Sequence, residues 1–103
     1  MKMKHDKLVR DEIPAIIERS GRRCVTRVLD EREYIERLDC KLQEELDEYL
    51  ADGSIEELAD LVEVIHAAVV ARGSSWDALE SLRTEKKAAR GGFERRILLE
   101  ESD

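Results

Sequence analysis

The chain has 103 residues with a formal net charge of -7, which argues against general binding to the phosphate backbone of nucleic acids. Its length is enough for one small domain, over residues 1–103, and no repeat, low-complexity segment or linker marks a second. Only one Pro, five Gly and one Phe stand among abundant Leu, Ala, Glu and Arg, so the composition favours an all-α fold over a sheet.

Residues 1–10 are rich in bases and begin with MKMKHD, which we expect to be a loose end. Two cations follow, Lys7 and Arg10, and both could reach a phosphate group. On charge alone, exposed basic side chains are the simpler interpretation of these two residues. The residue types by themselves therefore leave both alternatives open at this point.

A short helix is expected next, with Asp11 as its cap, Pro14 in its first turn and Ser20-Gly21 at its end. Residues 22–29 (RRCVTRVL) follow and contain several β-branched side chains in a short run. They are the only β-like stretch of the chain. We expect an extended segment there, a lone edge at most, and no complete sheet.

Two long helices joined by a tight turn are expected over residues 30–72. Asp30 begins the first of them, and Ser54 followed by Glu57 fits a capping box at the start of the second. Between them, Gly53 stands where the end of a helix needs a left-handed residue. The caps and the turn together predict an antiparallel helical hairpin.

This hairpin brings acidic side chains from both helices together. Residues at equal distances from the turn face each other, which sets Glu48 level with Glu57 and Glu45 level with Asp60. Within each helix the two acids are three residues apart and therefore share a face. We expect four carboxylates in one small volume, with Glu44 beside them.

Carboxylates gathered in this way repel one another, and some would take up protons unless a cation neutralises them. Mg²⁺ prefers oxygen ligands and suits a site that also holds phosphate oxygens. The sequence therefore predicts a Mg²⁺ site, in which Mn²⁺ could substitute, with Glu45, Glu48, Glu57 and Asp60 as ligands. The competing interpretation is that these acids belong to the solvated surface of highly charged helices.

The helix from about Ile55 to Arg72 is apolar around nearly its whole circumference. Such a helix must be covered on several sides, and a chain this small has few other helices to cover it. We therefore expect an antiparallel helical bundle that is completed by homodimerisation, or by a dimer of dimers, with equivalent helices from both subunits.

A last helix is expected over residues 76–89, with a serine cap before it. Its cations Lys86 and Lys87 are most simply a solvated face, although a contact with phosphate is open to them. The two glycines at 91–92 break the helix. Residues 93–99 follow as an extended or docking segment.

Asp60, Glu63 and His66 interrupt the most apolar segment, so no apolar run reaches the length that spans a membrane. The first residues are basic but lack the apolar core of a signal sequence. Cys24 and Cys40 have no metal-type spacing and no secretory context. We expect two free thiols, a cytoplasmic location and no membrane partner.

One pattern of acids resembles the EExxE…ExxD signature of the MazG-type, all-α nucleotide pyrophosphohydrolase superfamily: Glu44, Glu45, Glu48, Glu57 and Asp60. The opening KLVRDEIP at residues 7–14 resembles that of small members related to phosphoribosyl-ATP pyrophosphohydrolase, and GGFE at residues 91–94 adds to the likeness. Only eight residues separate Glu48 from Glu57, fewer than is usual in MazG itself. The subgroup and the substrate therefore stay open.

The resemblance implies a Mg²⁺-dependent enzyme that attacks a nucleoside triphosphate at its α-phosphorus and releases a monophosphate and pyrophosphate. A house-cleaning role on modified nucleotides is implied in the same way. Hydrolysis of phosphoribosyl-ATP, an activity of the same superfamily, is the enzymatic alternative. A non-catalytic helical dimer that acts as an interaction or regulatory module is the alternative from another class.

The catalytic acids expected for this reaction are Glu44 and Glu45. A carboxylate that the metal does not saturate could position or deprotonate the attacking water. Glu44 is the better candidate for this role, because it lies off the line from Glu45 to Asp60. Under the same resemblance, four cations become candidates to hold the phosphates of the substrate: Lys7, Arg10, Lys86 and Lys87.

Overall fold

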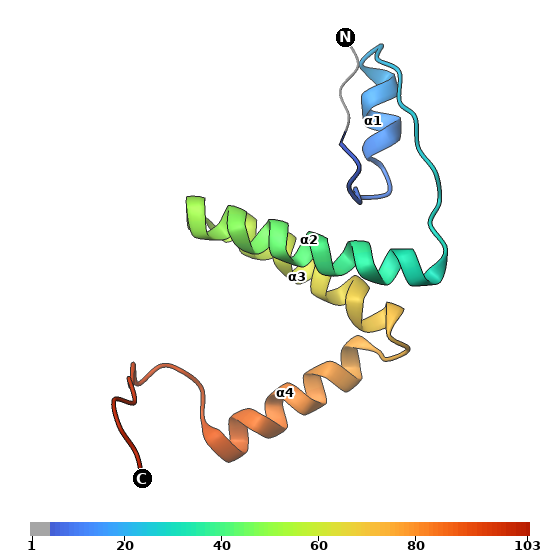
Figure 1. The fold of residues 1–103 in the computed structure, drawn as a ribbon. Helices are drawn as coiled ribbons and strands as arrows, with labels where there is room; N and C mark the ends of the chain where they lie inside the picture. The colour runs from blue at the N-terminus through green and yellow to red at the C-terminus, as the bar shows by residue number, and fades with distance from the viewer. Residues whose placement is uncertain (1–4) are drawn as a thin grey trace.

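The computed structural model of the chain describes residues 5–103, so the start of the expected loose end, residues 1–4, lies outside the described residues. Four α-helices follow one another (Figure 1): α1 (Ile13–Arg19), α2 (Glu31–Asp52), α3 (Ile55–Ala71) and α4 (Trp76–Arg90). Residues 5–103 contain no β-strand. The all-α class that the composition predicts is confirmed.

Side-chain oxygens cap the three longer helices where the sequence predicts. The carboxylate of Asp30 accepts from the N–H of Glu33 at 2.9 Å at the start of α2. The hydroxyl of Ser54 accepts from the N–H of Glu57 at 3.3 Å at the start of α3, and Ser75 caps α4 in the same way. Each cap satisfies a backbone donor that the helix leaves free, and so marks where the helix begins.

The start of α1 differs from the expectation that Asp11 caps it. The residue before the helix is Glu12, and it makes no capping hydrogen bond through its side chain. A backbone turn takes the place of the side-chain cap, because the N–H of Ile13 donates to the carbonyl of Arg10 at 3.0 Å. Pro14 has no N–H that would need a partner. A side-chain cap is therefore not required.

The α2–α3 hairpin is the central element of the fold (Figure 1). Gly53 ends α2 in the left-handed conformation, with φ 71°, and its N–H donates to the carbonyl of Tyr49 at 2.6 Å. The two helices pack against each other along their lengths. Their interface holds the buried apolar side chains of the described chain, Leu38 and Val64. The expected antiparallel hairpin is confirmed.

Helix α4 contacts α3 near the turn that joins them and then diverges from the hairpin (Figure 1). At the junction the rings of His66 and Trp76 pack edge to face, with their centroids 5.3 Å apart. The radius of gyration of the chain is 18.0 Å, whereas a compact domain of about 100 residues has a radius near 13 Å. The single chain is therefore extended and has a very small core.

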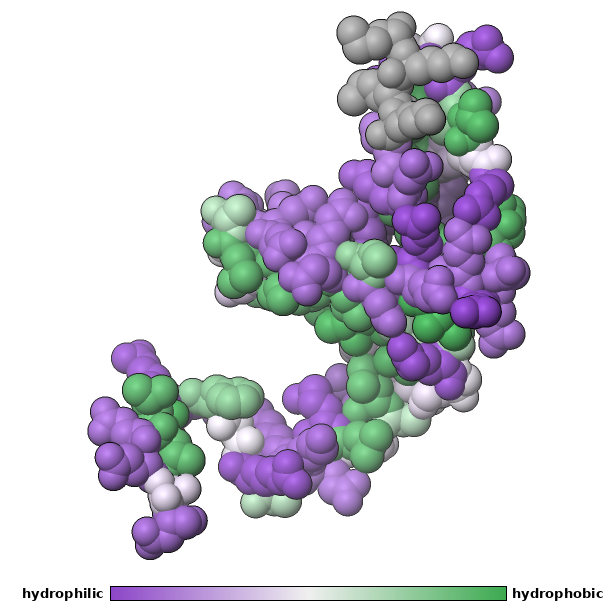
Figure 2. Space-filling model, in the orientation of Figure 1, coloured by the Kyte–Doolittle hydropathy of each residue, from purple (hydrophilic) through white to green (hydrophobic). Residues whose placement is uncertain are grey.

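Much apolar surface stays uncovered as a result. Figure 2 shows hydrophobic surface on the side of the hairpin that faces α4, and hydrophilic surface on the opposite side. The exposed apolar side chains of α3 and α4 include Ile55, Val62, Val70 and Leu82. An apolar helix face of this kind is normally covered in a stable protein. Among the helices of residues 5–103, none combines the length and the apolar character needed to cross a membrane.

The two segments expected to be extended lie outside the helices. Residues 22–29 form neither helix nor strand and link α1 to α2, with Val25 and Val28 almost fully exposed. The segment at 93–99 begins instead with a turn, in which the N–H of Arg96 donates to the carbonyl of Phe93 at 3.2 Å. Only its later part continues without regular structure.

Candidate metal centre

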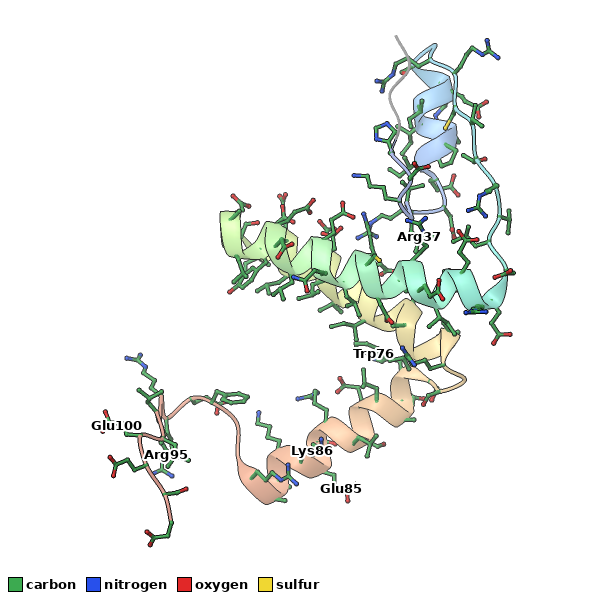
Figure 3. All side chains as sticks on the ribbon, viewed as in Figure 1. Arg37, Trp76, Glu85, Lys86, Arg95 and Glu100 are labelled. Carbon is green, nitrogen blue, oxygen red and sulfur yellow. The ribbon has the colours of Figure 1, made fainter. Side chains whose placement is uncertain are left out.

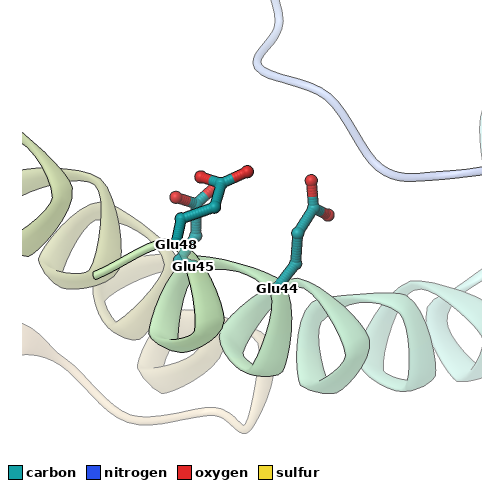
Figure 4. Close-up of side chains that lie close together, drawn as sticks. All are labelled: Glu44, Glu45 and Glu48. Atoms are coloured by element: carbon teal, nitrogen blue, oxygen red, sulfur yellow. The ribbon is translucent and has the colours of Figure 1, made fainter. Parts of the chain in front are cut away.

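Five carboxylates from α2 and α3 meet on one side of the hairpin. One oxygen each from Glu45, Glu57 and Asp60 lie within 4.8 Å of one another, and the same holds for Glu44, Glu45 and Glu48. Glu45 belongs to both groups and joins them. Figure 4 shows the three acids of α2 projecting from the same side of that helix. The structure thus places the acids that the hairpin geometry selects in two overlapping groups, which pair Glu45 with Asp60 but do not pair Glu48 with Glu57.

Glu45 is the centre of this acid cluster, and it is buried, with an exposed fraction of 6%. Its Oε2 atom has no hydrogen-bond partner among the described residues, and the same is true of Glu57 Oε2. An unpaired polar atom in a buried position costs about 1–3 kcal/mol, and more when it carries charge. The cluster therefore calls for a proton or a cation at Glu45.

The pKa values of two neighbouring acids shift in opposite directions. Burial raises the pKa of Glu45, and the adjacent Glu48 carboxylate raises it further, against the lowering effect of Lys41. Burial would also raise the pKa of Glu44, but the hydrogen bonds and charges of Lys41 and Lys7 outweigh it and lower this pKa overall. Glu45 thus lacks a sufficient counter-charge, whereas Glu44 already has one.

The structure places Lys7 and Arg10 at the rim of the acid cluster. Lys7 Nζ lies 3.3 Å from Glu44 Oε1, and Arg10 Nη2 lies 2.8 Å from Asp60 Oδ1. Both basic side chains are about half exposed. Nearby, Arg37 holds the same segment to α2 through a 2.8 Å hydrogen bond to the carbonyl of Asp6. Lys7 and Arg10 are thus held at the site by ion pairs with its carboxylates, and the exposed sides of both cations are open to an anion.

The single chain does not bring Lys86 and Lys87 to the acid cluster. Both residues lie on α4, which contacts α3 but not α2 among the described helices. Figure 3 shows Lys86 on the part of α4 that lies away from the hairpin. The nearest acid to Lys87 is Glu94, whose Oε1 lies 3.8 Å from Nζ. A phosphate held at the acid cluster of the same chain would be beyond these two lysines.

Lys41 is a member of the site that sequence reasoning missed. Its Nζ lies 3.3 Å from Glu44 Oε2 and 3.4 Å from Glu45 Oε1. The spacing could have revealed it, because residues three and four positions apart on a helix are neighbours.

The carboxylates differ in how free they are to bind a cation. Both oxygens of Glu44 lie against ammonium groups, those of Lys7 and Lys41. The remaining acids are Glu45, Glu57 and Asp60, which offer oxygens to one volume, and Glu48, which lies with Glu45 in the second group. Oxygen donors in this number, without sulfur or imidazole, suit a hard divalent cation such as Mg²⁺ or Mn²⁺.

Two hollows on the surface of the chain lie elsewhere. Both are shallow and open to solvent, and both are formed around Glu31 and Ile35, where α2 begins. Neither includes a carboxylate of the acid cluster. Walls for a bound nucleotide next to the cluster would have to come from another surface.

Comparison of the chain with protein-family models, with curated proteins and with solved structures finds no match in any of the three. The family that the pattern of acids suggests therefore stays a prediction.

Proposed function

We propose that this protein is a Mg²⁺-dependent nucleotide pyrophosphohydrolase, which converts a nucleoside triphosphate to the monophosphate and pyrophosphate. The observation that carries this proposal is the buried Oε2 of Glu45, which has no hydrogen-bond partner within residues 5–103 and lies among acids from two helices. A structural acid would have a donor at this atom, whereas a metal ligand needs the atom free. The resemblance to the EExxE…ExxD pattern supports the choice of reaction.

In this proposal the metal is held by Glu45, Glu48, Glu57 and Asp60. When bound, Mg²⁺ orients the phosphate oxygens and draws off the negative charge that develops on them. Glu44 stays ionised because its pKa is lowered, and it is held by Lys7 and Lys41. An ionised carboxylate of low pKa orients a water molecule better than it removes a proton. We therefore assign Glu44 to positioning the attacking water.

Lys7 and Arg10 would exchange their carboxylate partners for phosphate oxygens of the substrate. Each side chain is about half exposed and sits at the rim of the acid cluster, so it can turn toward an anion without crossing the protein. The guanidinium of Arg10 matches two phosphate oxygens at once, whereas the ammonium of Lys7 acts as a point charge. Both would balance the charge of a pyrophosphate leaving group.

We also propose that the working form is a homodimer, or a dimer of dimers, in which the helices complete an antiparallel bundle. The single chain buries few apolar side chains, and α3 leaves Val62 and Val70 about half exposed. A second copy is the simplest cover for an apolar face of this size. It would also supply walls for the nucleotide, and it offers a route by which Lys86 and Lys87 of one chain could reach the acid cluster of another.

A panel of nucleoside triphosphates and phosphoribosyl-ATP, each with Mg²⁺, tests the activity. Hydrolysis in ¹⁸O-labelled water should place the label in the monophosphate, because attack occurs at the α-phosphorus. Label in orthophosphate, with a nucleoside diphosphate left behind, would mean another reaction. The uncovered apolar faces equally favour a second candidate, a non-catalytic helical dimer. Absence of any turnover or Mg²⁺ response across the panel would select that candidate.

A further inference from the structure

Lys41 touches both acids that we expect to act in catalysis. It precedes Glu44 by three residues and Glu45 by four, so the three side chains share one face of α2. The Lys41 side chain is 16% exposed, far less than that of Lys7 at the rim. A lysine buried to this degree, with its ammonium between two carboxylates, is placed to act on their geometry.

Helix stability does not explain this placement. A lysine that precedes a glutamate by four residues has the less favourable order for pairing on a helix. Removing most of a lysine from water also has a desolvation cost that an ion pair only partly offsets. The side chain is therefore better explained by what it does to its two partners than by what it adds to α2.

The ion pair with Lys41 involves only one of the two carboxylate oxygens of Glu45. Oε1 lies 3.4 Å from Lys41 Nζ, whereas Oε2 is buried and has no hydrogen-bond partner in the part of the chain that the structure describes. Holding one oxygen of a carboxylate restricts rotation of the whole group. The same ammonium lies 3.3 Å from Oε2 of Glu44. One side chain thus limits the orientation of both acids on this face of the helix.

We propose that Lys41 is a positioning residue, which holds one oxygen of Glu45 so that the other is presented to the metal. The inference rests on the metal site proposed above. Partners of this kind, which orient a ligand without touching the metal, typically change metal affinity by about 10–100-fold when they are lost. Lys41 therefore favours metal binding even though its charge repels the metal.

The two possible roles of Lys41 predict opposite changes in metal affinity when the side chain is removed. If Lys41 only neutralised the acids, its removal would take away a positive charge that repels the metal ion, and metal binding would become tighter. If it positions Glu45, its removal should weaken metal binding. Direct titration of the full-length protein with Mn²⁺, followed by electron paramagnetic resonance, separates the two without any need for turnover. Circular dichroism reports in parallel whether the helices remain intact.

We expect Lys41→Met to weaken Mn²⁺ binding by about tenfold or more, within the range for such orienting partners. Methionine keeps the length of the side chain and a good helix propensity. Lys41→Gln removes the charge but keeps a hydrogen-bond donor, so it should retain more affinity than Lys41→Met. The matched control is Lys7→Met, which removes a cation from Glu44 at the rim without touching Glu45, and it should not weaken binding.

Mn²⁺ binding by Lys41→Met that equals or exceeds that of the wild type, with the helices intact, would overturn the inference and leave the metal site standing. Failure of the wild-type protein to bind Mn²⁺ would instead remove the metal site itself, and the inference with it. If Lys41→Met does not fold, Lys41→Gln decides alone: binding weaker than that of the wild type supports positioning, and equal or tighter binding contradicts it.

Discussion

Arg10 Nη2 lies 2.8 Å from Asp60 Oδ1, and this ion pair links two residues that are 50 positions apart in the chain. It sets a cation of the N-terminal segment against an acid that we assign to the metal site. A carboxylate oxygen held by a guanidinium is less available to a metal ion. If Asp60 is a metal ligand as proposed, we expect Arg10 and the metal to compete for it, and this competition can be measured.

The variant Arg10→Met should move two binding constants in opposite directions. Without the guanidinium, Asp60 is free, and affinity for Mn²⁺ should rise about two- to fivefold, the range that an exposed ion pair can supply. The KM for the nucleotide should rise, because a phosphate contact is lost. Metal titration and steady-state kinetics measure the two effects. Arg32→Met is the control, since Arg32 pairs with Glu36 in an exposed position on α2. A fall in metal affinity would contradict the competition.

Removal of a metal ligand should abolish activity without unfolding the protein. Asp60→Ala and Glu48→Ala each lower the repulsion within the acid cluster, so the metal-free protein should keep its helices and lose no thermal stability through the cluster. Both variants should lose more than about 100-fold in kcat/KM, beyond what indirect partners of a metal typically contribute.

Thermal melts with and without Mg²⁺ give an independent measurement for these variants. The wild-type protein should gain stability with Mg²⁺, by mass action, and the variants should not. Asp47→Ala is a suitable control, because Asp47 lies on α2 between the acids but its exposed carboxylate pairs with Gln43 outside the acid cluster. Full activity in either ligand variant would show that the site is misplaced.

The raised pKa of Glu45 predicts how the stability of the metal-free protein varies with pH. Its ordinary value is 4.5, and burial together with Glu48 raises it in the folded state. The folded protein therefore keeps a proton that the unfolded chain releases. The resulting stability is fully present below pH 4.5 and is lost as pH rises through the raised pKa.

Thermal melts across this pH range, in the presence of a chelator, test the prediction when the wild type is compared with Glu45→Gln. The variant cannot ionise at this position, so the difference between the two proteins isolates Glu45 from other acids. Saturating Mg²⁺ should reduce the loss, because it binds the ionised form. A difference that stays constant with pH would mean that Glu45 keeps its ordinary pKa in the folded state.

The assembly state should depend on the uncovered face of α3. We expect sedimentation at micromolar concentration to give at least twice the chain mass of 11.9 kDa. Val62→Glu places a charge on this face and should shift the protein toward monomer with a lower melting temperature. Val25→Glu is the matched control, since Val25 is 98% exposed in the segment between α1 and α2. A compact monomer for the wild type would remove the dimer from the proposal.

The hairpin and the placement of its acids could be derived from the sequence because they depend on interactions between residues that are close in the chain. A glycine at 53 and a serine at 54 specify a helix end and a helix start, and the helical repeat then decides which residues share a face. From these alone, Glu48 is expected to lie near Glu57, and Glu45 near Asp60. The structure brings Glu45 together with Glu57 and Asp60, and Glu48 together with Glu44 and Glu45, in two groups that share Glu45.

What surrounds those acids was decided by the tertiary structure. The burial of Glu45, and the contacts of Lys7 and Arg10 with acids of α2 and α3, depend on how segments far apart in the chain pack together. Asp11 likewise had the residue type of a cap, but the backbone turn before Ile13 made a cap unnecessary. Residue types state which contacts are chemically available, whereas the free energy of packing the whole chain selects which of them form.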